Sequence, residues 1–169
     1  MSDTREIRYF DYVNADYERV RDVLQSAPLA VCHSATKTAA EPGGDHTAAL
    51  HFGVGGFALG TDVDITVRNV EERPATPRHA ETTTLTFEWQ AAGYPWLFPF
   101  MHAELTAYPI NDSNTQLELV SRYAPPLGAV GAAVDALIGH RIAHVCVDRF
   151  LADVAGHLRA TLPHASSPQ

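Results

Sequence analysis

One uninterrupted stretch near the C-terminus constrains the fold of this chain more than any other feature. Between Pro126 and Leu162 the only proline is the first residue, so the stretch is long enough for a helix of about nine turns. Steps of three and four residues alternate along one set of positions, which are Ala133, Leu137, His140, His144, Val147, Leu151, Val154 and Leu158. This spacing predicts one long helix with a single face turned toward the rest of the protein.

Two positions on that face are polar. His140 and His144 lie one helical turn apart near its middle, and the positions on either side of them are apolar. A helix face that is apolar at both ends and imidazole in the centre indicates a helix that covers a partly polar pocket. We expect the rest of the chain to supply the other wall of this pocket.

The composition fits one domain. The chain has 169 residues and 46% apolar content, which is enough for a core. We expect a single domain over residues 1–162 and a disordered tail over residues 163–169, which are mostly small and polar. The net charge of −8 and the pI near 5.5 argue against nucleic acid or an anionic membrane as the main partner, because both bind basic faces.

Signals for membrane insertion, export and cofactor binding are missing from the sequence. No apolar run reaches about 18 residues, and the charged N-terminal segment lacks the core of a signal peptide, so we expect a cytoplasmic protein that is not an integral membrane protein. Cys32 and Cys146 are too few for a disulfide framework or a cysteine zinc site and are read as reduced thiols without an assigned role. Because nucleotide-binding, nucleophile-elbow and zinc-protease motifs are also missing, we expect no cofactor.

The N-terminal third mixes a strand with short helices. Residues 5–13 read as a first strand, Asn14 is a good N-cap for a helix that ends near residue 25, and residues 29–34 could form a second brief helix after Pro28. Residues 41–45 have the chemistry of a turn.

Beyond this turn the apolar period changes from helical to two. Alternation of this kind predicts half-buried strands over residues 47–54, 62–68, 83–90, 101–108 and 116–123. Short polar connections between such strands are typical of a meandering antiparallel sheet. The fold class is therefore α+β, with a curved sheet of about six or seven strands covered by the long C-terminal helix and two short helices after the first strand.

The order of these elements resembles the START-like (SRPBCC) superfamily, whose architecture is the helix-grip fold. Local stretches add to the resemblance, namely Tyr123-Ala124-Pro125-Pro126-Leu127-Gly128, Arg141-Ile142-Ala143, Arg149-Phe150-Leu151 and the strand from Pro99 to Leu105. They are similar to small bacterial members of the polyketide cyclase/dehydrase or lipid-carrier type. The resemblance implies a cavity between the concave sheet and the last helix, but the superfamily includes carriers, cyclases, hydrolases and receptors, so it does not decide the chemistry.

The inward strand positions and the helix face together define a candidate ligand site. Its residues are Phe52, Ile65, Phe87, Trp89, Met101, Leu119, Ser121, Tyr123, Leu137, His140 and His144, with Val63 and Leu105 also pointing inward and Ala133 on the helix. This mostly apolar and aromatic set suits a small hydrophobic ligand, lipid-, aromatic- or polyketide-like, that carries a few oxygens. The alternative is a core filled by its own side chains.

The two histidines allow several roles. Each could be a structural side chain with a partner such as Ser121 or Tyr123, or could bind a ligand oxygen. As acid–base groups, His140, His144 and Tyr123 are the catalytic candidates of a polyketide cyclase or aromatase. Two imidazoles at this spacing could also bind a metal, but no further ligand is evident and no metal is expected.

Two apolar features could instead serve an interaction. The connection from Tyr94 to Phe100 could be a pocket mouth, a lid, a dimer contact or simply a packed hairpin end. The opposite helix stripe is also apolar and consists of Val134, Ile138, Ile142 and Val145. A homo-oligomeric interaction module, for example a homodimer, is therefore a further alternative to the carrier and the enzyme.

Overall fold

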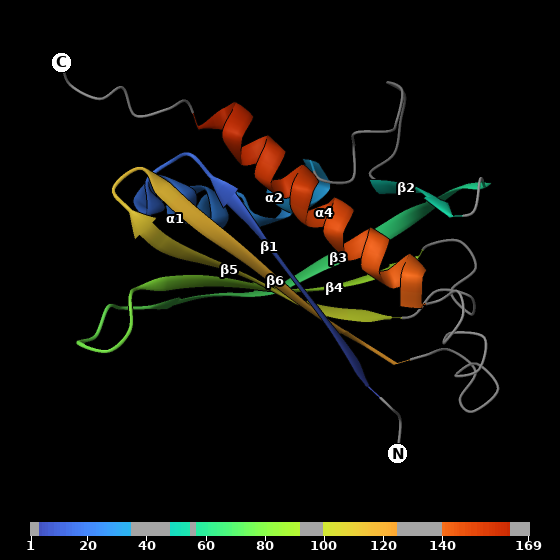
Figure 1. The fold of residues 1–169 in the computed structure, drawn as a ribbon, viewed down its shortest axis with the longest axis horizontal. Coiled ribbons are helices and arrows are strands. Elements are labelled where there is room, and N and C mark those ends of the chain that lie inside the picture. Colours follow the sequence, from blue (N-terminus) through green and yellow to red (C-terminus); the bar gives the residue numbers. More distant parts are fainter. Residues whose placement is uncertain (1–3, 35–47, 55–56, 92–99, 125–139, 163–169) are drawn as a thin grey trace.

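The computed structural model describes residues 4–34, 48–54, 57–91, 100–124 and 140–162. Figure 1 shows a twisted antiparallel sheet that the long helix α4 crosses diagonally, with the short helix α1 near one end and α2 beside α4. The elements follow the chain in the order β1, α1, α2, β2 to β6 and α4. The α+β helix-grip architecture predicted from the sequence is confirmed.

The described sheet has six strands in the order β1-β6-β5-β4-β3-β2, and every neighbouring pair is antiparallel. Strands β2 to β6 follow one another as a meander, whereas β1 pairs across the chain with β6. The bounds are β1 Arg5–Val13, β2 Ala48–Val54, β3 Phe57–Arg73, β4 Thr82–Ala91, β5 Met101–Asn111 and β6 Asn114–Tyr123. The predicted range of β1 is matched, and that of β2 is matched from Ala48 on, with its first predicted residue outside the described part of the chain. The ranges of β4, β5 and β6 are extended by a few residues at most.

The third strand is much longer than the sequence predicted. β3 has 17 residues, and its pairing with β4 shifts between Val67 and Asn69. A bulge adds one residue to one strand and reverses the phase of its alternation. The alternation that identifies residues 62–68 therefore ends at the bulge. The mostly polar residues from there to Arg73 do not continue it, so the sequence did not predict them as part of the strand.

The two N-terminal helices lie where they were expected, but the cap differs. Helix α1 spans Tyr17–Ser26, and its N-cap is Asp16, whose carboxylate accepts a hydrogen bond from the backbone N–H of Arg19 at 3.0 Å. The prediction that Asn14 is the cap is wrong, because the helix begins two residues later. Helix α2 spans Pro28–Ser34 and begins at the proline, whose fixed φ suits the first turn of a helix.

Helix α4 spans His140–Thr161 in the described part of the chain and packs chiefly against β1. The predicted start of this helix lies outside the described residues. Its inward face is the predicted one, since Val147, Leu151, Val154 and Leu158 are all buried. They meet the buried inner side chains of the sheet, which include Ile7, Leu85, Phe87, Leu105, Leu117 and Leu119.

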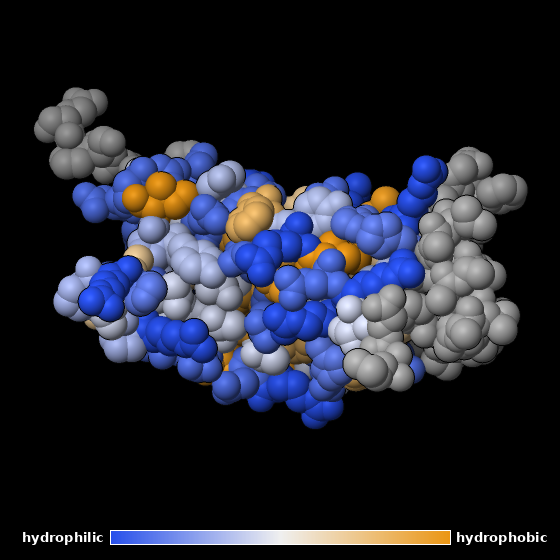
Figure 2. All heavy atoms as spheres, turned by 60° about the horizontal axis from the view of Figure 1, so that its bottom comes forward, coloured by the Kyte–Doolittle hydropathy of each residue, from blue (hydrophilic) through white to orange (hydrophobic). Residues whose placement is uncertain are grey.

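The outer face of the sheet is polar. Arg122 links Glu6 and Glu104 at 3.0 and 3.2 Å, and Arg8 contacts Glu118 at 2.9 Å. Figure 2 shows a mostly hydrophilic surface on the side that Figure 1 places at the bottom. The apolar side of the sheet is therefore the one beneath α4.

Candidate functional site

The strand register brings the predicted inward residues together on one face. Ile65 lies opposite Trp89, Trp89 opposite Met101, and Met101 opposite Tyr123, which forms one row across four strands. In the next row Phe87, Ala103, Ser121 and Ile7 lie side by side, and Leu85, Leu105, Leu119 and Tyr9 follow in the third. Every member of these rows is buried except Ile65 and Tyr9, which are half-buried.

Helix α4 covers these rows with an aromatic contact. The ring of Phe150 lies 5.3 Å from that of Phe87 and 5.1 Å from that of Trp89, measured between centroids. Both contacts are tilted, a favourable arrangement for aromatic pairs. The cover over the middle of the sheet is thus aromatic and tightly packed.

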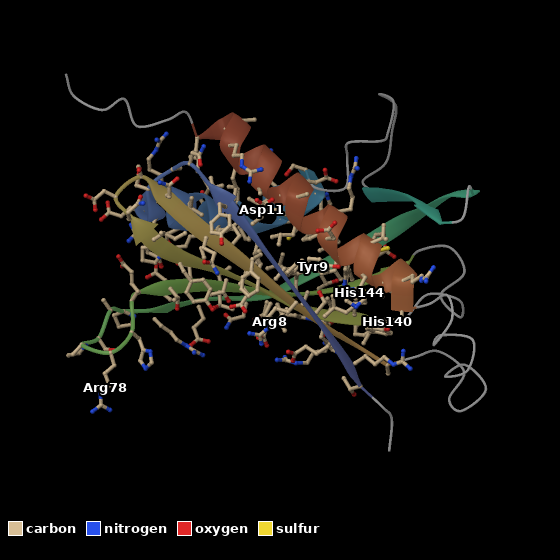
Figure 3. The ribbon with its side chains drawn as sticks, viewed as in Figure 1. Arg8, Tyr9, Asp11, Arg78, His140 and His144 are labelled. Carbon is tan, nitrogen blue, oxygen red and sulfur yellow. The ribbon has the colours of Figure 1, made fainter. Side chains whose placement is uncertain are left out.

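Four polar rings meet where the first described turns of α4 face β1 and β6. The hydroxyl of Tyr9 lies 3.0 Å from Nδ1 of His144, and the hydroxyl of Tyr123 lies 3.4 Å from Nδ1 of His140. The two imidazole rings are 4.3 Å apart and nearly perpendicular. Figure 3 shows Tyr9 on β1 beside His144 and His140 on α4. We call these four residues the Tyr–His cluster.

Burial keeps the Tyr9–His144 pair neutral. The pKa of His144 is lowered by burial and by the charge of nearby His140, while burial and the carboxylate of Asp148 raise the pKa of Tyr9. In this hydrogen bond the phenol donates when the imidazole proton is on Nε2, and it accepts when that proton is on Nδ1. The pair combines a proton donor and a neutral imidazole, the components of acid–base chemistry.

Exposure varies across the Tyr–His cluster. Tyr123 is buried, Tyr9 and His144 are half-buried, and His140 is exposed. The cluster therefore extends from the interior of the domain to its surface. Within the described ranges, no three His, Cys, Asp or Glu side chains are grouped so that they could hold a metal ion.

Two polar atoms on the inner face have no hydrogen-bond partner within the described part of the chain. They are Nε1 of Trp89 and Oγ of Ser121. Trp89 is 4% exposed and Ser121 is fully buried, so bulk water does not reach either atom. Buried polar groups almost always have a partner, so these two require an explanation.

Some predicted features lie outside the described residues. This holds for Leu137, for the side chain of Phe52, and for most of the 94–100 connection and of the second helix stripe. Of those two features, Phe100 and Val145 are described and are exposed. The homodimer, the cytoplasmic location and the disordered tail all stay predictions.

Tyr9 is the site residue that sequence reasoning missed. Its side chain is on the inner face of β1, two residues after Ile7. Arg5 and Asp11 are on the same face, so apolar and polar residues do not alternate regularly along this strand. The only available signal was the two-residue step from Ile7 to Tyr9.

A separate hollow of about 790 Å³ lies on the outer side of the sheet, lined by charged residues and threonines. Three of its arginines, Arg8, Arg73 and Arg122, already pair with glutamates. Its chemistry is that of a solvated sheet face, which does not suit a hydrophobic ligand.

Comparison with known proteins supports the fold. No family model and no curated protein matches this chain. A crystal structure of a protein from Thermus thermophilus superposes with a TM-score of 0.54 and 13% identity, over 94% of this chain and 100% of that one. An aromatase/cyclase from a Streptomyces species has a TM-score of 0.47 and 16% identity, over 98% of this chain and 99% of that one. A truncated norcoclaurine synthase from Thalictrum flavum has a TM-score of 0.49 and 12% identity, over 93% of this chain and 94% of that one.

The described architecture is the helix-grip fold, as the sequence predicted. The superposition on the Thermus thermophilus protein supports the fold alone, because a fold does not fix a reaction or a ligand. In the described part of the chain, no helix has both the length and the apolar character needed to cross a bilayer.

Proposed function

We propose that this protein binds a small hydrophobic molecule between the inner face of its sheet and α4. The observation that carries the proposal is the Tyr–His cluster, which places four polar rings at one end of an otherwise apolar, aromatic face. Ligand sites commonly combine an apolar lining with a few convergent polar groups of this kind. The position of this combination between the sheet and α4 supports the proposal.

The position of the cluster suits the entry of a ligand. Tyr123 lies in the same row as Trp89 and Met101, and His140 at the other end of the cluster is exposed. A molecule that enters past His140 would meet polar groups first and the aromatic rows behind them. Its apolar body would replace contacts among Phe87, Trp89 and Phe150, and its oxygens would stay near the phenols and imidazoles.

Titration with an environment-sensitive aromatic dye tests the proposal, and native mass spectrometry gives the stoichiometry. We expect saturable binding of one dye molecule per chain. Phe10→Ala is the control, because Phe10 is a half-exposed aromatic residue on the outer face of β1 and could bind dye nonspecifically. Binding that does not saturate, or that disappears in this control, would contradict a ligand site beneath α4.

The Tyr–His cluster also favours a second function, that of a polyketide cyclase or aromatase. A neutral imidazole can take a proton from a carbon that lies between two carbonyl groups. The resulting enolate carbon attacks another carbonyl of the same substrate, a carbon–carbon bond forms, and the new alkoxide takes the proton back from the imidazolium. His140 or His144 would move the proton, and Tyr123 or Ser121 would orient the substrate oxygen.

The combined replacement His140→Ala and His144→Ala tests this second function. We expect it to reduce turnover of a poly-β-ketone substrate by roughly 10²–10⁴-fold, the usual contribution of general acid–base catalysis, while the circular dichroism spectrum is unchanged. His157→Ala is the matched control, because His157 is on the same helix but outside the cluster. Full turnover in the double variant would eliminate these roles, whereas dye binding without turnover in the wild type would favour the carrier.

A further inference from the structure

The two unpartnered atoms of the inner face restrict what a ligand must offer. An indole Nε1–H is only a donor, so Trp89 can be satisfied by an acceptor alone. The hydroxyl of Ser121 can donate as well as accept. A ligand that satisfies both therefore needs acceptor atoms, and an ammonium group, which has no lone pair, cannot serve Trp89.

One enclosed water does not account for both atoms. Trp89 is on β4 and Ser121 on β6, with β5 between them, and they belong to neighbouring rows of the sheet. Two strand spacings separate their backbones by roughly 10 Å. A buried water also needs at least two polar partners, and the residues next to Ser121 in its row, Ile7 and Ala103, are apolar.

The other polar groups near this face already have partners. The hydroxyl of Tyr123 is within reach of His140, that of Tyr9 is bonded to His144, and that of Thr83 is bonded to Tyr17 at 2.7 Å. Asp11, the carboxylate on the inward side of β1, is bonded to Arg159. The inner face thus offers free donors, and the carboxylate of Asp148, which acts on Tyr9, belongs to an exposed residue of α4.

We propose that Trp89 and Ser121 are specificity-determining donors for carbonyl oxygens, so that the ligand is a neutral ketone-bearing apolar molecule and not an amine or a pure hydrocarbon. This inference rests on the proposed binding function. An apolar pocket without donors favours a hydrocarbon over the matching ketone, because burial of an unpaired carbonyl is costly. Where the pocket has donors without a partner, the ketone binds more tightly than the hydrocarbon, because its carbonyl oxygen accepts their hydrogen bonds.

Three bicyclic ligands of matched skeleton, 1-tetralone, tetralin and 1-aminotetralin, test the inference by displacement of the dye. We expect the wild type to bind 1-tetralone at least as tightly as it binds tetralin. We expect it to bind 1-aminotetralin at least roughly tenfold more weakly than 1-tetralone. In the combined variant Trp89→Phe and Ser121→Ala, the ratio of tetralone to tetralin affinity falls by roughly tenfold or more. The affinity ratio isolates the two donors, because the smaller phenylalanine ring changes the apolar contacts of both ligands alike.

Thr83→Val is the matched control, because it removes a buried hydroxyl that has a partner and lies outside these rows. We expect the affinity ratio to be unchanged in this variant. Ser121→Ala alone adds a stability readout, since removal of an unpaired hydroxyl leaves the unfolding midpoint unchanged or raises it. A lowered midpoint would show that Ser121 has a structural partner and would overturn its role as a free donor.

The outcomes separate the two proposals. If tetralin binds more tightly than 1-tetralone and the ratio is the same in every variant, the donor role is wrong and the binding function stands. If neither compound displaces the dye, the hydrophobic binding site is wrong and the donor role falls with it.

Discussion

Replacement of Phe150 by alanine lowers the free energy of unfolding by about 3–5 kcal/mol, the usual cost of truncating a buried phenylalanine. The ring is fully buried and packs on both Phe87 and Trp89, so its removal leaves a cavity between α4 and the middle of the sheet. Urea denaturation followed by circular dichroism measures the change. Phe150→Leu, which keeps most of the volume, costs less than about 1.5 kcal/mol.

Val145→Ala is the control for this prediction. Val145 is on the same helix but is 40% exposed, so its truncation changes the free energy of unfolding by about 0.5 kcal/mol or less. If Phe150→Ala were as mild as Val145→Ala, α4 would not be docked on the aromatic rows, and the binding site proposed between them would lose its wall.

Tyr17→Phe lowers the free energy of unfolding by about 1–3 kcal/mol through a single hydrogen bond. The hydroxyl of Tyr17 on α1 meets Oγ1 of Thr83 on β4 at 2.7 Å, and both side chains are buried. Removal of one partner leaves the other buried without a bond. Thr83→Val has an effect of the same size for the same reason.

The double variant Tyr17→Phe and Thr83→Val distinguishes this bond from general packing. Because neither partner is then left unpaired, its cost is smaller than the sum of the two single costs, with a coupling of about 1–2 kcal/mol. Thr84→Val is the control, because Thr84 pairs with Thr106 on the half-buried outer face. We expect this substitution to lower the free energy of unfolding by about 0.5 kcal/mol. Additive costs in the double variant would mean that the hydroxyls do not interact.

Most of the fold could be predicted because its strands have one solvent-exposed face and one buried face. The period of two located β4, β5 and β6, and the three- and four-residue steps identified the inward face of α4. Prediction failed where local chemistry broke the period. The bulge near Val67 shortened the predicted β3, and the predicted cap Asn14 lies two residues before Asp16, whose side chain caps α1 in the structure.

The candidate site could be predicted only in part, for a related reason. Inward parity identified Trp89, Ser121 and Tyr123, because each lies in a strand with clean alternation. The bond between Tyr9 and His144 joins residues 135 positions apart, and it depends on how α4 docks against β1. No local pattern encodes that docking. Likewise, the isolation of Trp89 Nε1 is a property of its packed surroundings.

The pairing of β1 with β6 has a consequence for folding during synthesis. The first strand emerges from the ribosome early, but its only strand partner in the described sheet ends at Tyr123, and α4 comes later still. Arg159, which bonds to Asp11 and to the carbonyl of Tyr12, joins residues 148 positions apart. At ordinary rates of synthesis β1 waits on the order of ten seconds for these partners. The nascent chain therefore presents an incomplete sheet with an uncovered apolar face until β6 and α4 have been synthesised.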